Sequence, residues 1–367
     1  MILTAGPSIT KKEISYVLDA TKNGWNFHFN DYVEKFEKEV ARYVGVKHAM
    51  ATSSGTGALH LSLLAMGIGP GDEVILPEIS AVASANVITF TGAKPIFVDI
   101  EQDTWCIDPK SFERAITKRT KAVMPVHLYG HPSNMTEINK IAKKRGLYVL
   151  EDACPSLGAT CNSIKTGSLG DMGAFSFQGA KIVVTGEGGM LVSNNSKLFE
   201  KAQYIADLGR DRKRGAFWHT IVGYKYKMSN IQAALGLSQT ERIESLVGKK
   251  RRIFSWYKKR LDTLAGLTMN VEKDWARNTY WMSSIVLPKK SRVSRDELMH
   301  ELHNRMVDTR PFFFPFSMLP MYRAKTNNRV AYQVGLTGIN LPSGVNLTEE
   351  EVDYVCKQVI TILEKGV

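Results

Sequence analysis

The sequence predicts an α/β protein with a mostly parallel sheet covered by helices on both faces and a smaller C-terminal α+β domain. Between Glu73 and Asp152, short apolar runs alternate with helical stretches, which is typical of parallel strands joined by helices. Beyond about Ser245, helices and strand-like runs follow in mixed order. Because 367 residues exceed one small domain, we expect a large domain over 1–244 and a small domain over 245–367.

The individual elements follow from hydrophobic periodicity and from the positions of breakers. Ser8 is a candidate N-cap for the first helix, and Gly24 ends that helix. We predict helices at 11–22, 30–43, 58–64, 81–89, 109–115, 135–145, 249–265, 295–304 and 348–364. We predict strands at 47–52, 73–76, 95–99, 120–126, 148–152, 174–177, 190–193, 267–271 and 283–287.

Composition and charge narrow the class of protein. The hydrophobic content of 44% supports a core, and the net charge of +12 is spread along the chain, with dense runs only at 210–214 and 249–252. Neither run belongs to a recognisable nucleic-acid module, so we expect no nucleic-acid partner, while a basic surface suits anionic small substrates. We find no signal peptide and no apolar run long enough to span a membrane, and we therefore expect a cytoplasmic protein.

Three motifs are set aside. The glycine-rich stretch 67–71 follows a helix and contains a proline, so it fails the dinucleotide-binding pattern. His127 and His131 lack a third ligand at a convincing spacing, and the four cysteines have no metal-ligand spacing. We therefore predict no metal site and no disulfide scaffold.

Lys181 is the first candidate catalytic residue. It follows the apolar run 174–177, and β-branched residues and a glycine turn at 186–189 come after it. Burial makes a charged lysine costly and should lower its pKa. A neutral amine of this kind can form a Schiff base with a carbonyl. A lone lysine at a solvated strand end is the simpler interpretation, so further residues must decide between the two.

A second candidate site is the small polar loop 53–57, between a strand and a helix. Free backbone N–H groups and the helix dipole make such a junction an anion site, and Ser54 and Thr56 add hydroxyl groups. An ordinary helix cap would have the same sequence.

Asp152 connects these observations. It ends an apolar strand at the rim of the sheet, where ligands bind in α/β proteins. A carboxylate there can keep a pyridine nitrogen protonated, as pyridoxal 5′-phosphate (PLP) requires to act as an electron sink. With Lys181 for the imine, the loop 53–57 for the phosphate and Ser176 as a further hydroxyl donor, one cofactor explains all of these residues.

The chain resembles the DegT/DnrJ/EryC1/StrS family of sugar aminotransferases, which are fold type I PLP enzymes. The resemblance covers nearly the whole length. Its motifs are SSGTGALHL (53–61), PVHLYGHP (125–132), EDA (151–153), GSLGDMGAFSF (167–177), TGEGG (185–189), GYKYKMSNIQAALGLSQ (223–239) and LPSGVNLTEEE (341–351). Within the family, the opening TAGPSIT and the stretch TWCIDP (104–109) resemble enzymes of the perosamine and viosamine type.

The resemblance implies a reaction. PLP takes an amino group from L-glutamate, giving 2-oxoglutarate and pyridoxamine phosphate, and passes it to the keto carbon of a nucleotide-linked 4-keto-6-deoxy sugar. Lys181 is implied to be the imine lysine and the proton-moving base, and Asp152 the partner of the ring nitrogen. Ser54, Gly55, Thr56 and Ser176 are implied to bind the phosphate. The product would be a 4-amino-4,6-dideoxy sugar nucleotide for polysaccharide synthesis.

Four positions depart from the family pattern. Ala81 stands where an aromatic residue commonly stacks on the cofactor ring. Lys225 replaces an asparagine that reaches the phosphate of the neighbouring subunit, so the resemblance implies a homodimer with shared active sites. Pro155 replaces a glutamine after the EDA motif, and Ser317 replaces a histidine. Ala81 and Lys225 are kept as candidate cofactor contacts.

Trp25, Glu187 and Arg310 are candidate substrate contacts, although a core salt bridge explains a single arginine equally well. Other acceptors, such as a 3-keto sugar or a keto-cyclitol, stay open. So does a protein of this fold that binds PLP without turnover and acts as a regulator.

Overall fold

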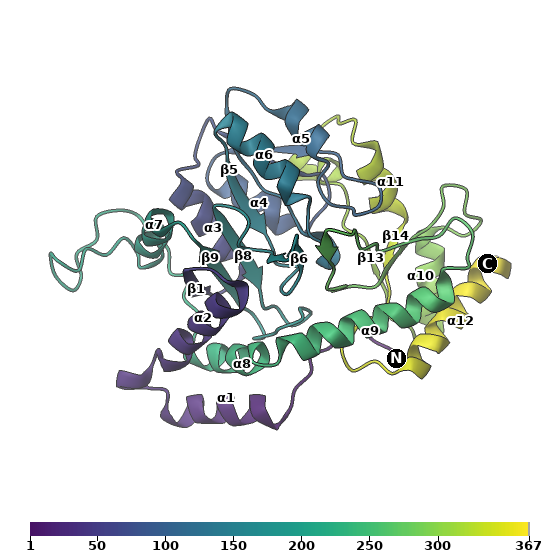
Figure 1. Cartoon of the computed structure of the whole chain (residues 1–367), viewed down its shortest axis with the longest axis horizontal. Helices are drawn as coiled ribbons and strands as arrows, with labels where there is room; N and C mark the ends of the chain where they lie inside the picture. Colours follow the sequence, from purple (N-terminus) through teal and green to yellow (C-terminus); the bar gives the residue numbers. More distant parts are fainter. Residues whose placement is uncertain (366–367) are drawn as a thin grey trace.

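A seven-stranded sheet forms the centre of the computed structural model, which describes residues 1–365 (Figure 1). In chain order its strands are β1 (His48–Thr52), β2 (Glu73–Pro77), β3 (Lys94–Val98), β4 (Thr120–Val123), β5 (Tyr148–Asp152), β8 (Met172–Ser176) and β9 (Gly189–Ser193). They lie in the order β1-β9-β8-β5-β4-β2-β3. β9 runs antiparallel to β1 and β8, and the remaining pairs are parallel. The prediction of a mostly parallel sheet is confirmed.

Helices cover both faces of this sheet, as predicted. One face packs against α3 (Gly55–Met66), α4 (Val82–Phe90) and α7 (Ser196–Ala206). The opposite face packs against α5 (Pro109–Ala115) and α6 (Met135–Arg145) at one end, and against α2 (Asp31–Val44) and α8 (Asn230–Thr240) at the other. Neighbouring residues of β8 show the alternation, because Ala174 belongs to the first core and Phe175 to the second.

The first helix, α1 (Lys11–Asn23), shows why one sequence expectation was wrong. Its N-cap is Thr10 and not Ser8: the backbone N–H of Lys12 donates to the Thr10 hydroxyl, and the Glu13 carboxylate accepts the Thr10 backbone N–H. This reciprocal pair is a capping box, in which Glu or Gln stands three positions after the cap. Ser8 instead contacts Arg242 through its hydroxyl.

The C-terminal part contains a second sheet. Its strands are β10 (Thr268–Met269), β12 (Ser284–Val286), β13 (Arg310–Pro311) and β14 (Gly338–Asn340), in the order β10-β12-β14-β13 and all antiparallel. Its helices are α9 (Ile243–Leu261), α10 (Arg295–Asn304), α11 (Arg329–Thr337) and α12 (Glu349–Lys365). The strands predicted at 267–271 and 283–287 are present as the shorter β10 and β12, which pair antiparallel.

Helix α9 does not have the predicted bounds. It begins six residues before the expected position 249 and ends at Leu261 instead of 265. Figure 1 shows it leading from α8 toward α12. Its first turns, with Ile243 and Val247, join the core of the large sheet, and Ile253 and Tyr257 join the C-terminal core. Because α9 contributes to both cores, the division between 244 and 245 stays a prediction.

Other differences concern elements that were not predicted or that end elsewhere. Helices α7, α8 and α11 and strands β13 and β14 lie outside the predicted elements. The strand predicted over 120–126 ends at Val123, and the β-branched residues after Lys181 form a loop. A small sheet of β6 (Thr160–Cys161), β7 (Ile164–Lys165) and β11 (Ala276–Arg277) lies outside the predicted elements, as do four 3-10 turns: η1 (Asn26–His28), η2 (Leu128–Gly130), η3 (Phe316–Met318) and η4 (Pro320–Tyr322).

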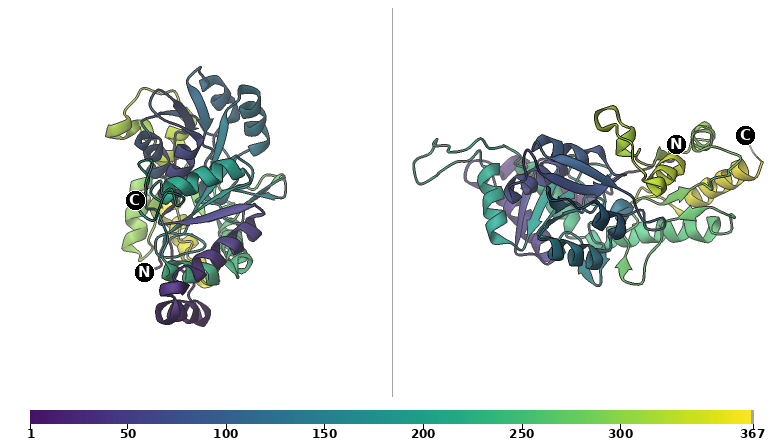
Figure 2. Two further views of the ribbon diagram at one scale, coloured as in Figure 1. Left: turned by 90° about the vertical axis from the view of Figure 1, so that its left-hand side faces the viewer. Right: turned by 90° about the horizontal axis from the view of Figure 1, so that it is seen from above.

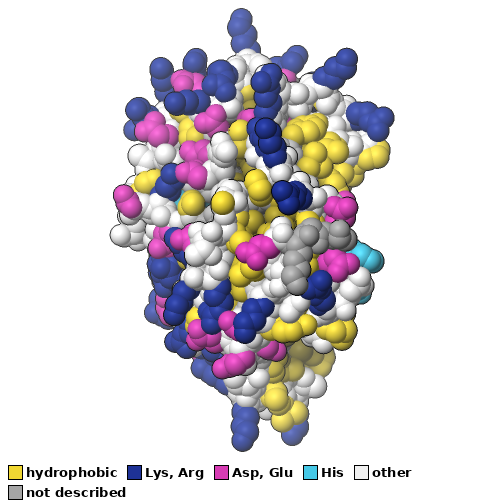
Figure 3. Space-filling view, turned by 90° about the vertical axis from the view of Figure 1, so that its right-hand side faces the viewer, with side chains coloured by type: hydrophobic (Ala, Val, Ile, Leu, Met, Phe, Trp, Pro, Cys, Tyr) yellow, Lys and Arg dark blue, Asp and Glu magenta, His cyan; other side chains and the backbone are white. Residues whose placement is uncertain are grey.

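The surface bears on possible partners. The loop that follows α7 extends away from the body of the protein in Figure 1 and in the right-hand view of Figure 2. Figure 3 shows Lys and Arg side chains scattered between acidic and apolar ones on the face it displays, without a continuous basic stripe. Among residues 1–365, no helix is both long and apolar enough to cross a membrane.

Candidate active site

Lys181 lies in the loop between β8 and β9, beyond the carboxyl end of β8. Its backbone N–H donates to the carbonyl of Gln178 (2.8 Å). The loop is closed by two further backbone bonds, from Phe177 N–H to the Gly188 carbonyl and from Thr185 N–H to the Phe177 carbonyl, each 2.8 Å. The loop is thus fixed by its own backbone, and Lys181 is delivered at the ligand-binding edge of the sheet.

The surroundings of the Lys181 amine lower its pKa to about 8 by burial, as the sequence predicts. Cys154 and Asp152 oppose this shift. Burial also raises the pKa of the Cys154 thiol well above its ordinary value, so that the thiol is neutral at neutral pH and Asp152 supplies the negative charge. The Lys181 Nζ lies 3.5 Å from the ring centroid of Trp281.

Asp152 is buried at the end of β5, and two donors orient its carboxylate. The Ser84 hydroxyl donates to Oδ2 (2.6 Å), and the Cys154 backbone N–H donates to Oδ1 (3.2 Å). Each oxygen keeps a free lone pair, so the carboxylate can accept one more hydrogen bond from a protonated ring nitrogen.

The preceding residue, Glu151, is bound by groups of the protein itself and has a structural role. It accepts backbone N–H bonds from Gly167, Leu169 and Gly170 (2.6–2.8 Å) and a bond from His127 Nε2 (2.9 Å). The Ser133 N–H donates to the other ring nitrogen of His127. His127 is therefore satisfied as a structural side chain, and no cluster of metal-ligating side chains occurs within residues 1–365.

The N-terminus of α3 has the geometry expected of an anion site, and phosphate binding there stays a prediction. Ser54 is the N-cap, and its hydroxyl accepts the Gly57 N–H (3.0 Å). The N–H groups of Gly55 and Thr56 have no acceptor in the described part of the chain. A Cβ on Gly55 would lie 2.8 Å from Cys154 Sγ and 2.9 Å from Ser176 Cβ, so only glycine lets this helix end approach β5 and β8 so closely.

The structure thus brings four predicted residues together, Gly55, Asp152, Ser176 and Lys181. Cys154, Ser176, Lys181 and Trp281 line one small cavity, Gly55 packs on Cys154 and Ser176, and Asp152 acts on the charge of Lys181. A larger cavity, of about 650 Å³, lies elsewhere, between α2, β1, α7 and the loop 207–228, and none of the cofactor candidates lines it. We therefore place the chemistry at Lys181.

Comparison with known proteins agrees with this arrangement. The model of the DegT/DnrJ/EryC1/StrS aminotransferase family matches residues 7–360. The chain belongs to this family. It is 41% identical over 354 residues to the GDP-perosamine synthase of Escherichia coli O157:H7 (96% of each chain) and 41% identical over 357 residues to that of Caulobacter vibrioides (96% of each chain). A putative sugar aminotransferase of Streptococcus pneumoniae, solved in its PLP form, superimposes with a TM-score of 0.93 at 27% identity, covering 100% of this chain and 99% of the other.

The protein is therefore a PLP-dependent aminotransferase, and its residues fit this cofactor. The unpaired N–H groups of the α3 N-terminus and the hydroxyls of Thr56 and Ser176 suit a phosphate. Asp152 has acceptor capacity for the pyridine N–H, and Lys181 is an amine of lowered pKa at the same edge. The predicted fold type, the enzyme class and the cofactor are confirmed by the family.

Two cofactor candidates lie at the margin of this cluster. Ala81 is exposed and precedes α4 without a side-chain cap, so no side chain at this position covers a ring. Lys225 is exposed and forms no ion pair within the described chain, whereas the rings of its neighbours Tyr224 and Tyr226 face His60 on α3. The roles of both residues stay predictions.

The three substrate candidates do not line the cavity at Lys181. Trp25 is 56% exposed, and its indole N–H donates to the Thr21 carbonyl (2.7 Å). Glu187 is exposed in the glycine turn, and its backbone carbonyl accepts from Gln232. Arg310 is exposed in β13, outside any ion pair of the described residues; the core salt bridge considered for it is absent there.

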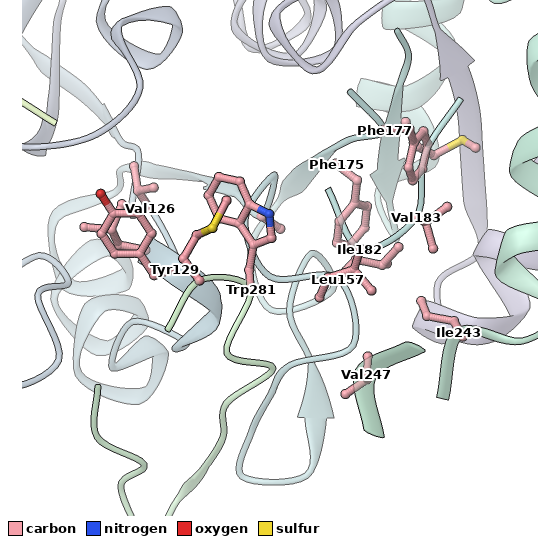
Figure 4. Packing of buried hydrophobic residues seen from close by; sticks show 14 of the residues in the cluster. Val126, Tyr129, Leu157, Phe175, Phe177, Ile182, Val183, Ile243, Val247 and Trp281 are labelled. Carbon is pink, nitrogen blue, oxygen red and sulfur yellow. The ribbon is translucent and has the colours of Figure 1, made fainter. Parts of the chain in front are cut away.

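Sequence reasoning missed two residues of the site. Ser84 follows Ala81 by three positions, and residues three apart lie on the same face of a helix. The candidate cofactor contact at Ala81 could therefore have pointed to Ser84. Trp281 is separated from Lys181 by 100 residues and lies between β11 and β12. No local pattern marks it. Figure 4 shows it between Tyr129 on one side and Leu157 and Ile182 on the other.

Proposed function

We propose that this protein transfers the amino group of L-glutamate to C4 of a nucleotide-linked 4-keto-6-deoxy sugar, yielding a 4-amino-4,6-dideoxy sugar nucleotide for polysaccharide synthesis. The observation that carries the proposal is the full-length similarity, at 41% identity, to two GDP-perosamine synthases. The cluster of Lys181, Asp152 and the α3 N-terminus provides the chemistry that such a transfer needs.

Each residue has a distinct part in the proposed chemistry. When bound, PLP supplies the electron sink that makes removal of a proton beside the reacting nitrogen feasible. The Lys181 Nζ accepts and returns this proton, and a pKa of about 8 keeps part of the amine neutral at neutral pH. The Asp152 carboxylate holds the ring N–H, while Ser84 and the Cys154 N–H fix the carboxylate. The α3 N-terminus anchors the phosphate.

We also propose that two copies share their active sites. The loop after α7 carries exposed apolar side chains, Phe217 (88%), Trp218 (52%) and Val222 (90%), and Trp25 and Phe27 are exposed on η1 and the residue before it. Exposed apolar surface of this extent favours burial against a partner. Lys225, three residues after Val222, would then contact the phosphate site of the other copy. The cytoplasmic location stays a prediction from the sequence.

The proposed reaction is tested with the purified protein, L-glutamate and a panel of GDP-, UDP- and dTDP-linked 4-keto-6-deoxy sugars, with the amino product identified by mass spectrometry and NMR. We expect amination at C4 and formation of 2-oxoglutarate, with Lys181→Ala inactive but folded. Amination at C3, or of a keto-cyclitol alone, would assign a different acceptor. A protein that binds PLP but aminates none of these would refute the proposal in favour of a regulatory role.

The shared site is tested by subunit complementation. Lys181→Ala and Lys225→Ala variants, each of low activity alone, are co-expressed with different tags and the mixed dimer is isolated. If the site is shared, one of its two sites combines Lys181 from one copy with Lys225 from the other, and activity returns to about half of the unmodified level. A monomer in light scattering, or a mixed dimer no more active than its parents, would contradict a shared site.

A further inference from the structure

Trp281 contacts Lys181 in two ways. Its indole N–H donates to the carbonyl of Ala180 (2.7 Å), the peptide group immediately before Lys181. The face of its ring lies 3.5 Å from Lys181 Nζ. One side chain therefore holds both the backbone and the amine of the same residue.

Trp281 is itself held by a buried lysine. Lys250 of α9 is only 2% exposed, and its Nζ donates to the carbonyl of Trp281 (3.0 Å) and to that of Ser343. No carboxylate of the described chain pairs with this ammonium. A lysine buried without a counter-ion is costly, and its two carbonyl contacts offset part of this cost and tie α9 to the segments of Trp281 and Ser343. The Ser343 hydroxyl adds a third link, because it accepts the Ser283 N–H (2.8 Å).

The surroundings make the Trp281 ring rigid. It is 6% exposed and belongs to the core that contains Tyr129, whose ring centroid lies 6.0 Å away. Figure 4 shows the indole enclosed between apolar side chains of separate segments. A rigid aromatic face is an effective support for a flexible lysine, because four side-chain torsions must otherwise be ordered at an entropic cost.

We infer that Trp281 is a positioning residue for Lys181, fixing the Ala180–Lys181 peptide through its N–H and the amine through its ring, and that Lys250 holds Trp281 in place. The inference rests on the proposed function at one point, the role of Lys181 in moving the proton during amino transfer. The ring favours the ammonium form of Lys181 and so limits the lowering of its pKa by burial, which the charge of Asp152 also opposes.

The amine contact is tested in protein stripped of cofactor with hydroxylamine. Acetic anhydride labels only the neutral amine, and mass spectrometry gives the labelling midpoint of Lys181 between pH 6 and 10. Trp281→Met keeps an apolar side chain but removes the ring, and we expect the midpoint to fall by about 0.5 to 1 pH unit. Trp275→Met, at a tryptophan that packs on His131, should leave it unchanged. An unchanged or raised midpoint in Trp281→Met would overturn the inference.

The backbone contact is tested by hydrogen exchange. Trp281→Phe keeps a ring but removes the N–H, and we expect at least threefold faster exchange in the peptide spanning 178–183. Lys250→Met should accelerate exchange in the same peptide, and Lys250→Arg should restore slow exchange. Exchange equal to that of the unmodified protein in both Trp281→Phe and Lys250→Met would overturn the inference. Neither readout uses a sugar substrate, so a failure of the proposed reaction would leave these results interpretable.

Discussion

The hydroxyl of Ser84 donates a 2.6 Å hydrogen bond to Oδ2 of Asp152, and both side chains are buried. The bond joins the start of α4 to the end of β5. Ala81 is the N-cap of α4, so the helix that follows this unusual residue also orients the Asp152 carboxylate, which is proposed to hold the ring nitrogen. Ala81, which stands where an aromatic residue is usual, is thus linked to Asp152 through α4 and Ser84.

Ser84→Ala should weaken cofactor binding without unfolding the protein. A hydrogen bond to a charged group contributes about 1.5–3 kcal/mol, and its loss lets the Asp152 carboxylate rotate, so we expect a Kd for PLP about tenfold higher. The Kd is measured by spectroscopic titration of stripped protein. Ser84→Thr, which keeps the hydroxyl, is the control. Equal affinity of Ser84→Ala and the unmodified protein would show that the Cys154 N–H alone orients Asp152.

A pair of glycines allows a test of how closely β9 packs against the N-terminus of α3. A Cβ on Gly189 would lie 2.4 Å from the carbonyl carbon of Ser54, where only backbone is available to move, whereas a Cβ on Gly248, on α9, meets nothing within 4 Å. We expect Gly189→Ala to destabilise the protein by about 3 kcal/mol or more through strain. We expect Gly248→Ala to stabilise it by about 0.5–1 kcal/mol. Both changes are measured by urea denaturation, and a Gly189→Ala protein as stable as the unmodified one would contradict the packing described here.

The sequence predicted the site better than the connections that support it. Lys181, Asp152, Ser176 and the loop 53–57 follow strand ends or precede a helix, and in a parallel sheet such positions converge. Their clustering was therefore accessible from local patterns. Helices with clear breakers, such as Pro109–Ala115 and Met135–Arg145, have the predicted bounds. The start of α9 was missed because no breaker separates it from α8 and its early turns pack on the large sheet.

Contacts between distant segments were not predictable in this way. Trp281 and Lys250 are far from Lys181 in the sequence, and their meeting depends on tertiary packing. Ser317 was noted only because a histidine is usual there, and the structure gives it a partner. The Glu78 carboxylate, which is fully buried, accepts both the N–H (2.8 Å) and the hydroxyl (2.6 Å) of Ser317.

Ser317→Ala should therefore destabilise the protein. The Glu78 carboxylate would lose one donor and keep the Ser317 N–H and the Asn328 side chain. Because removing a partner from a buried charged group costs about 1.5–3 kcal/mol, we expect a loss of this size in the free energy of unfolding. Ser255→Ala, at an exposed serine of α9, is the control. In a double-mutant cycle, Glu78→Gln should reduce the cost of Ser317→Ala, and additive effects would show that the two side chains act independently.

The pH dependence of stability should reveal the buried ammonium of Lys250. Burial lowers its pKa to about 7 from an ordinary 10.5, so between these values the unfolded chain binds the proton and the folded protein does not. Stability contributed by this group therefore rises with pH through that window and is lost as the pH falls toward 7. Relative to Lys250→Met, the unmodified protein should gain about 1–2 kcal/mol between pH 7 and 8.5. Lys181 titrates in the same window, so its labelling midpoint is measured in both proteins and its contribution is subtracted. Lys259→Met, at an exposed lysine of the same helix, is the control and should show no such pH dependence. A difference in unfolding free energy between the unmodified protein and Lys250→Met that does not change with pH would mean that Lys250 stays protonated beside its two carbonyl partners.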